Sequence, residues 1–235
     1  MKIYVLMTKG EGKTICQDSV LVGNNILSEG YMEYIPKENE RVTIAVADGV
    51  GGNKGGDVAS CMAVTGLRDG KFFLGTTLEH ISRTILETNQ SILDRSMADP
   101  GLEKMATTLT GIHITPEQMF AFHIGNTRLC RLQGVYLRGL TQDTADEGGR
   151  LIGCMGADPA LINRLKVWDI TKEIKPGQDL ILTSDGVHDP IQDEQLDEIM
   201  GMQGSKKEIM EQLEKTAREN GSTDDISIIW ISRKE

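Results

Sequence analysis

The chain has 235 residues, which suffice for one large domain with a well-buried core. Its 25 lysines and arginines against 35 aspartates and glutamates give a net charge of −10, which argues against nucleic-acid binding and against binding to anionic membranes. The four cysteines lack CxxC spacing, and no apolar run is long enough to span a bilayer. A cytoplasmic location is therefore expected, because cysteines without the density of a disulfide scaffold are typical of a reducing compartment.

The first half of the chain predicts short strands followed by two helices. Apolar runs predict strands over residues 2–8, 18–22 and 42–47, and a polar, proline-containing stretch over 29–40 predicts a connector. Apolar residues at helical spacing then predict helices over 57–67 and 77–97.

The second half predicts antiparallel sheet and then more helices. Segments rich in β-formers over 106–115, 119–124 and 127–137 are separated by the turns TPEQ and GNT, which predicts a β-meander. A glycine-rich, weakly patterned stretch covers 141–159. Strands are expected over 165–170 and 179–183, helices over 192–200 and 206–220, and a last strand over 226–231. The length admits an α/β or an α+β domain, and the pattern indicates one domain with antiparallel sheet over residues 1–235.

Three of the predicted strands have carboxylates at an end. Asp48 closes the strand in VADGVGG, Asp185 follows the strand in LTSDGVHD, and Asp224 precedes the strand in STDDIS. No lysine or arginine neighbours these acids in sequence, and an uncompensated carboxylate beside a buried strand is costly. A divalent cation would compensate all three, and oxygen ligands favour Mg²⁺ or Mn²⁺ over zinc.

Each of these motifs also has a plainer interpretation. Asp-Gly after a strand is most often a turn, and Asp224 or Asp225 could be a solvated turn residue or a cap. The glycines after Asp48 suggest a phosphate-binding loop but lack the GK[ST] and GxGxxG patterns, and the four histidines have no metal-ligand spacing. Thr107 and Thr108 are expected to satisfy backbone hydrogen bonds near the site. Spacing alone leaves open whether the three acids meet.

The order of the motifs is more informative than their spacing. The chain resembles the metal-dependent protein phosphatase 2C family in KTICQD (13–18), VADGVGGNKGGDVAS (46–60), ATTL (106–109), HIGNTRL (123–129), LTSDGVHDPI (182–191) and STDDIS (222–227). The resemblance spans nearly the whole chain. It implies an α+β fold, a four-layer sandwich of two antiparallel β-sheets flanked by antiparallel α-helices, forming a single catalytic domain over 1–235.

The resemblance also implies a centre of two Mn²⁺ or Mg²⁺ ions. By position, Asp48 would bridge the ions, the Gly49 carbonyl would bind one ion, and Asp185 with Asp224 would complete the other. Asp18 would hold water beside the ions. The ions would prepare a water molecule for in-line attack on the phosphorus of phosphoserine or phosphothreonine in proteins, without a phosphoenzyme intermediate.

Three positions depart from the family pattern. Lys13 stands where many relatives have an arginine that grips the substrate phosphate, and a lysine cannot form the bidentate fork. Val50 replaces a histidine proposed as general acid, so that role is vacant or passes to water on the metal. Asn126 replaces an aspartate that would serve a third ion, which predicts a weakened third site that Asp189 and Asp185 could still hold loosely.

The predicted activity is a phosphatase acting on phosphorylated proteins, opposing a serine/threonine kinase. The segment 142–151 is short where relatives of this family insert a flap that contacts the substrate, so the resemblance implies less discriminating recognition of the target or recognition mediated elsewhere. One alternative is a phosphatase-like pseudoenzyme that binds a phosphorylated partner without turnover, which Lys13, Val50 and Asn126 make conceivable and the three intact acids oppose. A second alternative, a hydrolase of small phosphoesters, shares the chemistry and differs only in the outer cleft.

Overall fold

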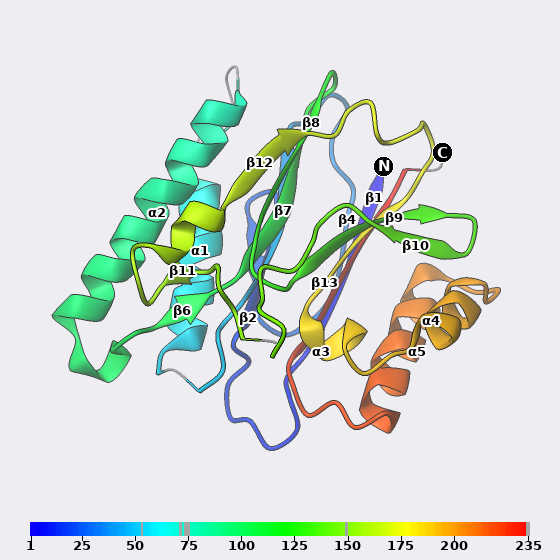
Figure 1. Ribbon diagram of the computed structural model, residues 1–235. Coiled ribbons are helices and arrows are strands. Elements are labelled where there is room, and N and C mark those ends of the chain that lie inside the picture. The colour runs from blue at the N-terminus through cyan, green and yellow to red at the C-terminus, as the bar shows by residue number, and fades with distance from the viewer. Residues whose placement is uncertain (53, 71, 73–75, 149, 234–235) are drawn as a thin grey trace.

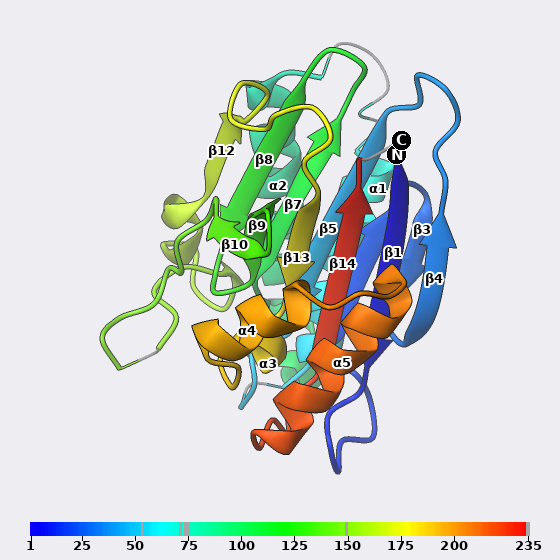
Figure 2. The ribbon, with the colours of Figure 1, turned by 90° about the vertical axis from the view of Figure 1, so that its right-hand side faces the viewer.

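The computed structural model describes residues 1–52, 54–70, 72, 76–148 and 150–233. Within these residues, two six-stranded antiparallel sheets pack face to face, and helices cover both outer faces (Figures 1 and 2). The α+β four-layer sandwich predicted from the sequence is confirmed. In the described part of the chain, no helix has both the length and the hydrophobicity needed to cross a bilayer.

One sheet has the strand order β10-β9-β13-β14-β1-β4, and the other has the order β12-β8-β7-β5-β2-β3. The strands of the first sheet are β1 (Lys2–Thr8), β4 (Gly30–Tyr34), β9 (Arg128–Gln133), β10 (Tyr136–Gly139), β13 (Leu180–Thr183) and β14 (Ile226–Ser232). Those of the second are β2 (Asp18–Val22), β3 (Asn25–Leu27), β5 (Val42–Asp48), β7 (Leu109–Ile114), β8 (Met119–Ile124) and β12 (Lys166–Asp169). A separate short pair joins β6 (Ala106–Thr107) to β11 (Met155–Gly156).

The helices form a layer on each side. On one side, α1 (Gly56–Asp69) and α2 (Leu78–Ala98) cover the sheet that contains β5; on the other, α4 (Asp193–Met200) and α5 (Lys206–Glu219) cover the sheet that contains β14 (Figure 2). Three short elements complete the chain, the 3-10 turns η1 (Pro100–Leu102) and η2 (Leu161–Arg164) and the one-turn helix α3 (Asp185–His188). A capping box between Ser205 and Glu208 begins α5, as its sequence favours.

Strand β5 shows why the chain forms a sandwich. Val42, Ile44 and Val46 belong to the core between the two sheets, whereas Ala45 and Ala47 belong to the core under α1 and α2. Because both faces of β5 are covered, the strand is a continuous apolar run rather than an alternating one. Apart from Thr43, its first polar side chain is Asp48, at its C-terminal end.

The polar connector predicted over 29–40 is wrong, because β4 lies inside it and pairs with β1. This strand is at the edge of its sheet, and Glu33 on it forms an ion pair with Lys2 across the pair (2.6 Å). Edge strands often carry such charges, which weaken the hydrophobic pattern that reveals a strand in the sequence. Strand β3, at the edge of the other sheet, was also missed, because it has only three residues and none of them is fully buried.

The predicted meander is correct for its first turn and wrong for its second. Strands β7 and β8 pair antiparallel across the TPEQ turn, but β8 and β9 belong to different sheets. Between them the chain crosses the sandwich at Gly125, whose φ of 112° is a conformation that L-residues rarely adopt. The single strand predicted over 127–137 is a hairpin of β9 and β10 that turns at Gly134.

Candidate metal centre

Asp48, Asp185 and Asp224 line one cavity of about 680 Å³ at one end of the sandwich. Asp48 is the last residue of β5, and Asp185 begins α3 directly after β13. Because β14 pairs antiparallel with β13, the start of β14, which Asp224 precedes, lies beside the end of β13 (Figure 2). Antiparallel pairing thus brings together acids that are far apart in the sequence.

The backbone around Asp48 is held by Thr107 of β6 and by Thr108, the residue after it. The Asp48 N–H donates to the Thr108 hydroxyl (3.0 Å), and the Asp48 carbonyl accepts from the Thr108 N–H (2.8 Å) and the Thr107 hydroxyl (2.9 Å). The expectation that these threonines satisfy backbone groups near the site is therefore confirmed. The next residue, Gly49, donates its N–H to the Gln17 carbonyl (3.0 Å), so the turn after β5 is fixed on both sides.

The acids of the site raise one another's pKa values. Burial, followed by repulsion from Asp18, Asp185 and Asp224, holds the pKa of Asp48 well above its usual value. Burial and then repulsion from Asp224 likewise raise the pKa of Asp185. Burial raises the pKa of Asp18 to about 7, although the Ser227 hydroxyl donates a hydrogen bond to it (2.6 Å). Such a cluster is more stable when a cation lies among the carboxylates.

Several oxygens of this cluster have no hydrogen-bond partner within the described residues. They are buried side-chain atoms, namely Oδ1 of Asp18, Oδ1 of Asp185 and Oδ1 of Asn126. Oxygen atoms of this kind suit a hard divalent cation. In the described ranges, no group of three or more Asp, Glu, His or Cys side chains is arranged so that it could hold a metal ion. The Asp224 carboxylate instead accepts hydrogen bonds from the Lys13 ammonium and from the Asp225 N–H.

Lys13 brings a positive charge to these acids, although it is far from them in the sequence. Its ammonium contacts the carboxylates of both Asp224 and Asp225, the latter at 2.9 Å. Asp225 is buried, and it also accepts from the backbone N–H groups of Gly10 (2.7 Å) and Gln17 (2.8 Å). The argument that no basic residue compensates these acids therefore fails for Asp224, because its partner comes from 211 residues away.

Asn126 and Asp189 occupy different surroundings, although both were predicted to serve a third ion. The Asn126 amide donates to Oδ2 of Asp185 (2.7 Å) and lines the acidic cavity. Asp189 is exposed and does not line the cavity, although its N–H donates to the Asp185 carbonyl (3.0 Å). Its carboxylate lies 3.9 Å from the Arg128 guanidinium. A weakened third site remains a prediction, and the amide gives it a physical reason because it occupies one oxygen of Asp185.

Asn126→Asp should destabilise the metal-free protein by about 1–3 kcal/mol, because it replaces a donor to Asp185 by another carboxylate. Added Mn²⁺ should recover most of this loss, since the new carboxylate is a better ligand than an amide. Thermal unfolding with and without Mn²⁺ measures both effects. Asn25→Asp on β3, which removes an amide donor to the Val22 carbonyl (3.3 Å), is the matched control. A loss of stability that Mn²⁺ leaves unchanged would contradict the idea.

The cavity has further lining residues that the sequence analysis did not single out. Lys104, Asp158 and Arg150 all belong to its wall. Arg150 lies in the segment 142–151, which the sequence predicts to be a shortened flap, and its N–H donates to the Asp146 carboxylate (3.0 Å). Residue 149 of this segment lies outside the described residues. No sequence signal marks Lys104 or Asp158, because their place in the wall depends on the pairing of β6 with β11.

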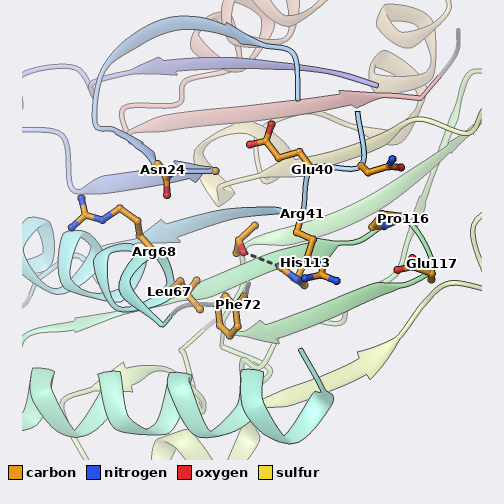
Figure 3. Close-up of a pocket in the computed structure, with 12 residues that line it drawn as sticks. Asn24, Glu40, Arg41, Leu67, Arg68, Phe72, His113, Pro116 and Glu117 are labelled. Carbon is orange, nitrogen blue, oxygen red and sulfur yellow. Dashed lines mark hydrogen bonds between the residues drawn. The ribbon is translucent and has the colours of Figure 1, made fainter. Parts of the chain in front are cut away.

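A second cavity of about 620 Å³ lies at the opposite end of β5 and β7, where Arg41 and Phe72 surround His113 (Figure 3). Glu40 on its rim accepts from the Tyr34 hydroxyl (2.6 Å) and the Lys37 N–H (2.7 Å). The Glu40 carboxylate is therefore already satisfied. Among the described residues, this cavity is lined by two acids, Glu40 and Glu117, whereas four acids line the first one.

His113 should make the fold sensitive to acid. Burial, and then the charges of Arg41 and His80, lower its pKa to about 4, so the folded state favours the neutral ring. Stability from this group is complete above pH 6.5 and is lost as the pH falls toward 4, by about 2 kcal/mol at pH 5. His113→Asn should flatten the dependence of unfolding free energy on pH between 7 and 5 by that amount. Parallel curves for the two proteins would contradict this.

The sandwich with acids gathered at one end agrees with the arrangement that the resemblance implied for metal-dependent phosphatases. A model of the family described as protein phosphatase 2C matches residues 13–226. The chain therefore belongs to the protein phosphatase 2C family.

Relatives and solved structures agree with this assignment. The serine/threonine phosphatase stp of Listeria monocytogenes is 27% identical over 222 residues, which cover 84% of this chain and 86% of that protein. The protein phosphatase PhpP of Streptococcus pneumoniae is 26% identical over 257 residues and covers 100% and 98% of the two chains. The catalytic domain of the phosphatase PstP in complex with two manganese ions superposes with a TM-score of 0.73 at 22% identity, covering 100% of both chains.

Proposed function

We propose that this protein is a Mn²⁺-dependent phosphatase that removes phosphate from phosphoserine and phosphothreonine in proteins. The observation that carries the proposal is the meeting of Asp48, Asp185 and Asp224 in one cavity of a chain that belongs to the protein phosphatase 2C family. The relatives named as serine/threonine phosphatases support the substrate class.

The proposed metal ligands are the carboxylates of Asp48, Asp185 and Asp224 and the carbonyl of Gly49. When bound, the ions supply a nucleophile from water at neutral pH and neutralise the charge of the phosphate. Asp18, buried beside Asp48 in the β2–β5 pair, orients water next to this centre, because the hydroxyl of Ser227 fixes its carboxylate. Asp189 and Asn126 are proposed to contribute only to a weak third site.

Lys13 is proposed to contact the substrate phosphate. Its ammonium is already held at the acids by Asp225, whose carboxylate also fastens the backbone at Gly10 and Gln17. The loop that carries Lys13 is therefore positioned before substrate binds. Because its ammonium is compact, Lys13 stabilises the phosphate by its charge rather than by a bidentate pair of hydrogen bonds.

Hydrolysis of a phosphothreonine peptide tests the proposal. We expect hydrolysis in Mn²⁺, none after chelation, and a loss of about 10³-fold or more in Asp185→Asn. Activity that survives the chelator would contradict the metal dependence. A wild-type protein that binds the phosphopeptide without cleaving it in Mn²⁺ would favour the pseudoenzyme.

The biological setting is proposed at a coarser level. A phosphatase of this class acts on the products of a serine/threonine kinase, so we propose a cytoplasmic circuit in which the enzyme opposes such a kinase. Comparing the phosphoproteins of cells with and without the enzyme tests this setting, since its substrates should gain phosphate when it is removed.

A further inference from the structure

The wall of the acidic cavity contains an unusual backbone conformation. Within the described residues, three non-glycine residues have a left-handed φ, and two of them, Lys104 (φ 59°) and Ala157 (φ 53°), line this cavity. A side chain in this region is costly, and glycine would adopt it more easily. Residues held in such conformations cluster at binding and catalytic sites.

Hydrogen bonds on both sides hold this wall in place. The Lys104 N–H donates to the hydroxyl of Ser96 on α2 (3.0 Å), and the Ala157 N–H donates to the carbonyl of Met105 (3.0 Å). The short strands β6 and β11 pair directly beside them. The side chain of Lys104 therefore leaves the wall from a fixed backbone position.

Lys104 carries a charge that the protein itself does not balance. Its side chain is exposed, and in the described part of the chain no carboxylate lies within ion-pair distance of its ammonium. The acid on the same wall, Asp158, accepts the N–H of Ala160 (2.8 Å). The charged residues that line the cavity are four acids and two bases, namely Asp48, Asp158, Asp185, Asp224, Lys104 and Arg150.

Lys104 lines the cavity, whereas Lys13 contacts the lining residue Asp224 and comes from a different element. Lys13 belongs to the loop fastened by Asp225, whereas Lys104 belongs to the turn between η1 and β6. If the phosphate lies at Asp48, Asp185 and Asp224, an ammonium on the separate wall faces the part of the substrate next to the phosphorylated residue. An unbalanced cation there favours an anion and disfavours a lysine or arginine.

We propose that Lys104 is a specificity-determining residue that binds an acidic side chain of the phosphoprotein beside the phosphorylated residue. This inference rests on the proposed function and names the class of sequence that the enzyme selects.

The test compares two phosphothreonine peptides that differ only in having Glu or Gln at the positions flanking the phosphothreonine. In Mn²⁺, we expect wild-type kcat/KM to favour the Glu peptide by about fivefold, the size of a well-placed exposed ion pair. The preference for the Glu peptide should persist in Lys104→Arg, and in Lys104→Met the two peptides should be hydrolysed with about equal kcat/KM. Lys104→Glu should instead prefer a third peptide with Lys at the flanking positions. Lys104→Gly should also remove the preference while raising the midpoint of thermal unfolding, because glycine tolerates the left-handed backbone.

Lys215→Met on α5, whose lysine pairs with Glu219 (3.8 Å), is the matched control and should keep the wild-type preference. Equal wild-type rates on the Glu and Gln peptides would overturn this inference and leave the proposed function intact. An equal loss on both peptides in Lys104→Met, with the preference retained, would also overturn it, because Lys104 would then act on the phosphate. Hydrolysis of neither peptide by the wild-type protein would overturn the proposed function as well.

Discussion

Asp48→Asn should lower kcat/KM on a phosphothreonine peptide by about 10³-fold or more and at the same time stabilise the metal-free protein. The activity falls because the carboxylate proposed to bridge the ions becomes a neutral, weaker ligand. Stability rises, by about 1 kcal/mol, because the substitution removes a carboxylate whose own pKa is held well above its usual value by burial and by repulsion from Asp18, Asp185 and Asp224. Steady-state kinetics in Mn²⁺ and chemical unfolding in chelator measure the two effects.

The matched control is Asp94→Asn on the exposed face of α2, whose carboxylate accepts from Gln90 (2.7 Å). This variant should change neither quantity appreciably. Opposite signs for activity and stability at Asp48 are diagnostic of a site whose charges serve a ligand rather than the fold. An Asp48→Asn protein that is less stable in chelator than wild type would mean that the carboxylate is structural.

Gly49→Ala should destabilise the protein by about 3 kcal/mol and abolish activity. An added Cβ would lie 2.4 Å from both the carbonyl carbon and the carbonyl oxygen of Gly56, which are backbone atoms at the start of α1. Either α1 or the turn after β5 must then move, and Asp48 moves with that turn. Thermal unfolding and peptide hydrolysis report the two consequences.

Gly51→Ala provides a control two residues further along the same turn. Nothing lies within 4 Å of a Cβ built at Gly51, and its φ is outside the left-handed region. We expect a change in stability within about 0.5 kcal/mol for this variant. If Gly49→Ala and Gly51→Ala destabilise the protein equally, the close approach of Gly49 to α1 would not be the reason that this turn needs a glycine at position 49.

The sequence predicted the elements with buried faces well and the edges of the sheets poorly. Strands such as β2 and β8, with five and six buried residues, were predicted with their observed bounds. The strand β4 was missed because half of its surface faces solvent. The crossing between the sheets at Gly125 was missed because GNT is equally compatible with a hairpin, and only the tertiary structure decides between the two.

The candidate site shows the same division. The acids were found because each stands at the boundary of an apolar strand in the order typical of the family. Lys13 and Asn126 were placed at the site by the resemblance, but their contacts with Asp224 and Asp185 were not predicted, because these contacts join segments 211 and 59 residues apart. The left-handed backbone of Lys104 has no sequence signature at all, because a lysine gives no indication of positive φ.

The number of Mn²⁺ ions bound per chain tests the central claim most directly. Equilibrium dialysis of the wild-type protein, with metal analysis of both compartments, should give two ions per chain, and Asp48→Asn should lose at least one of them. Wild-type protein that binds no Mn²⁺ at millimolar concentration, or an Asp48→Asn protein that still binds two ions with unchanged affinity, would contradict the proposal that these acids form the metal centre.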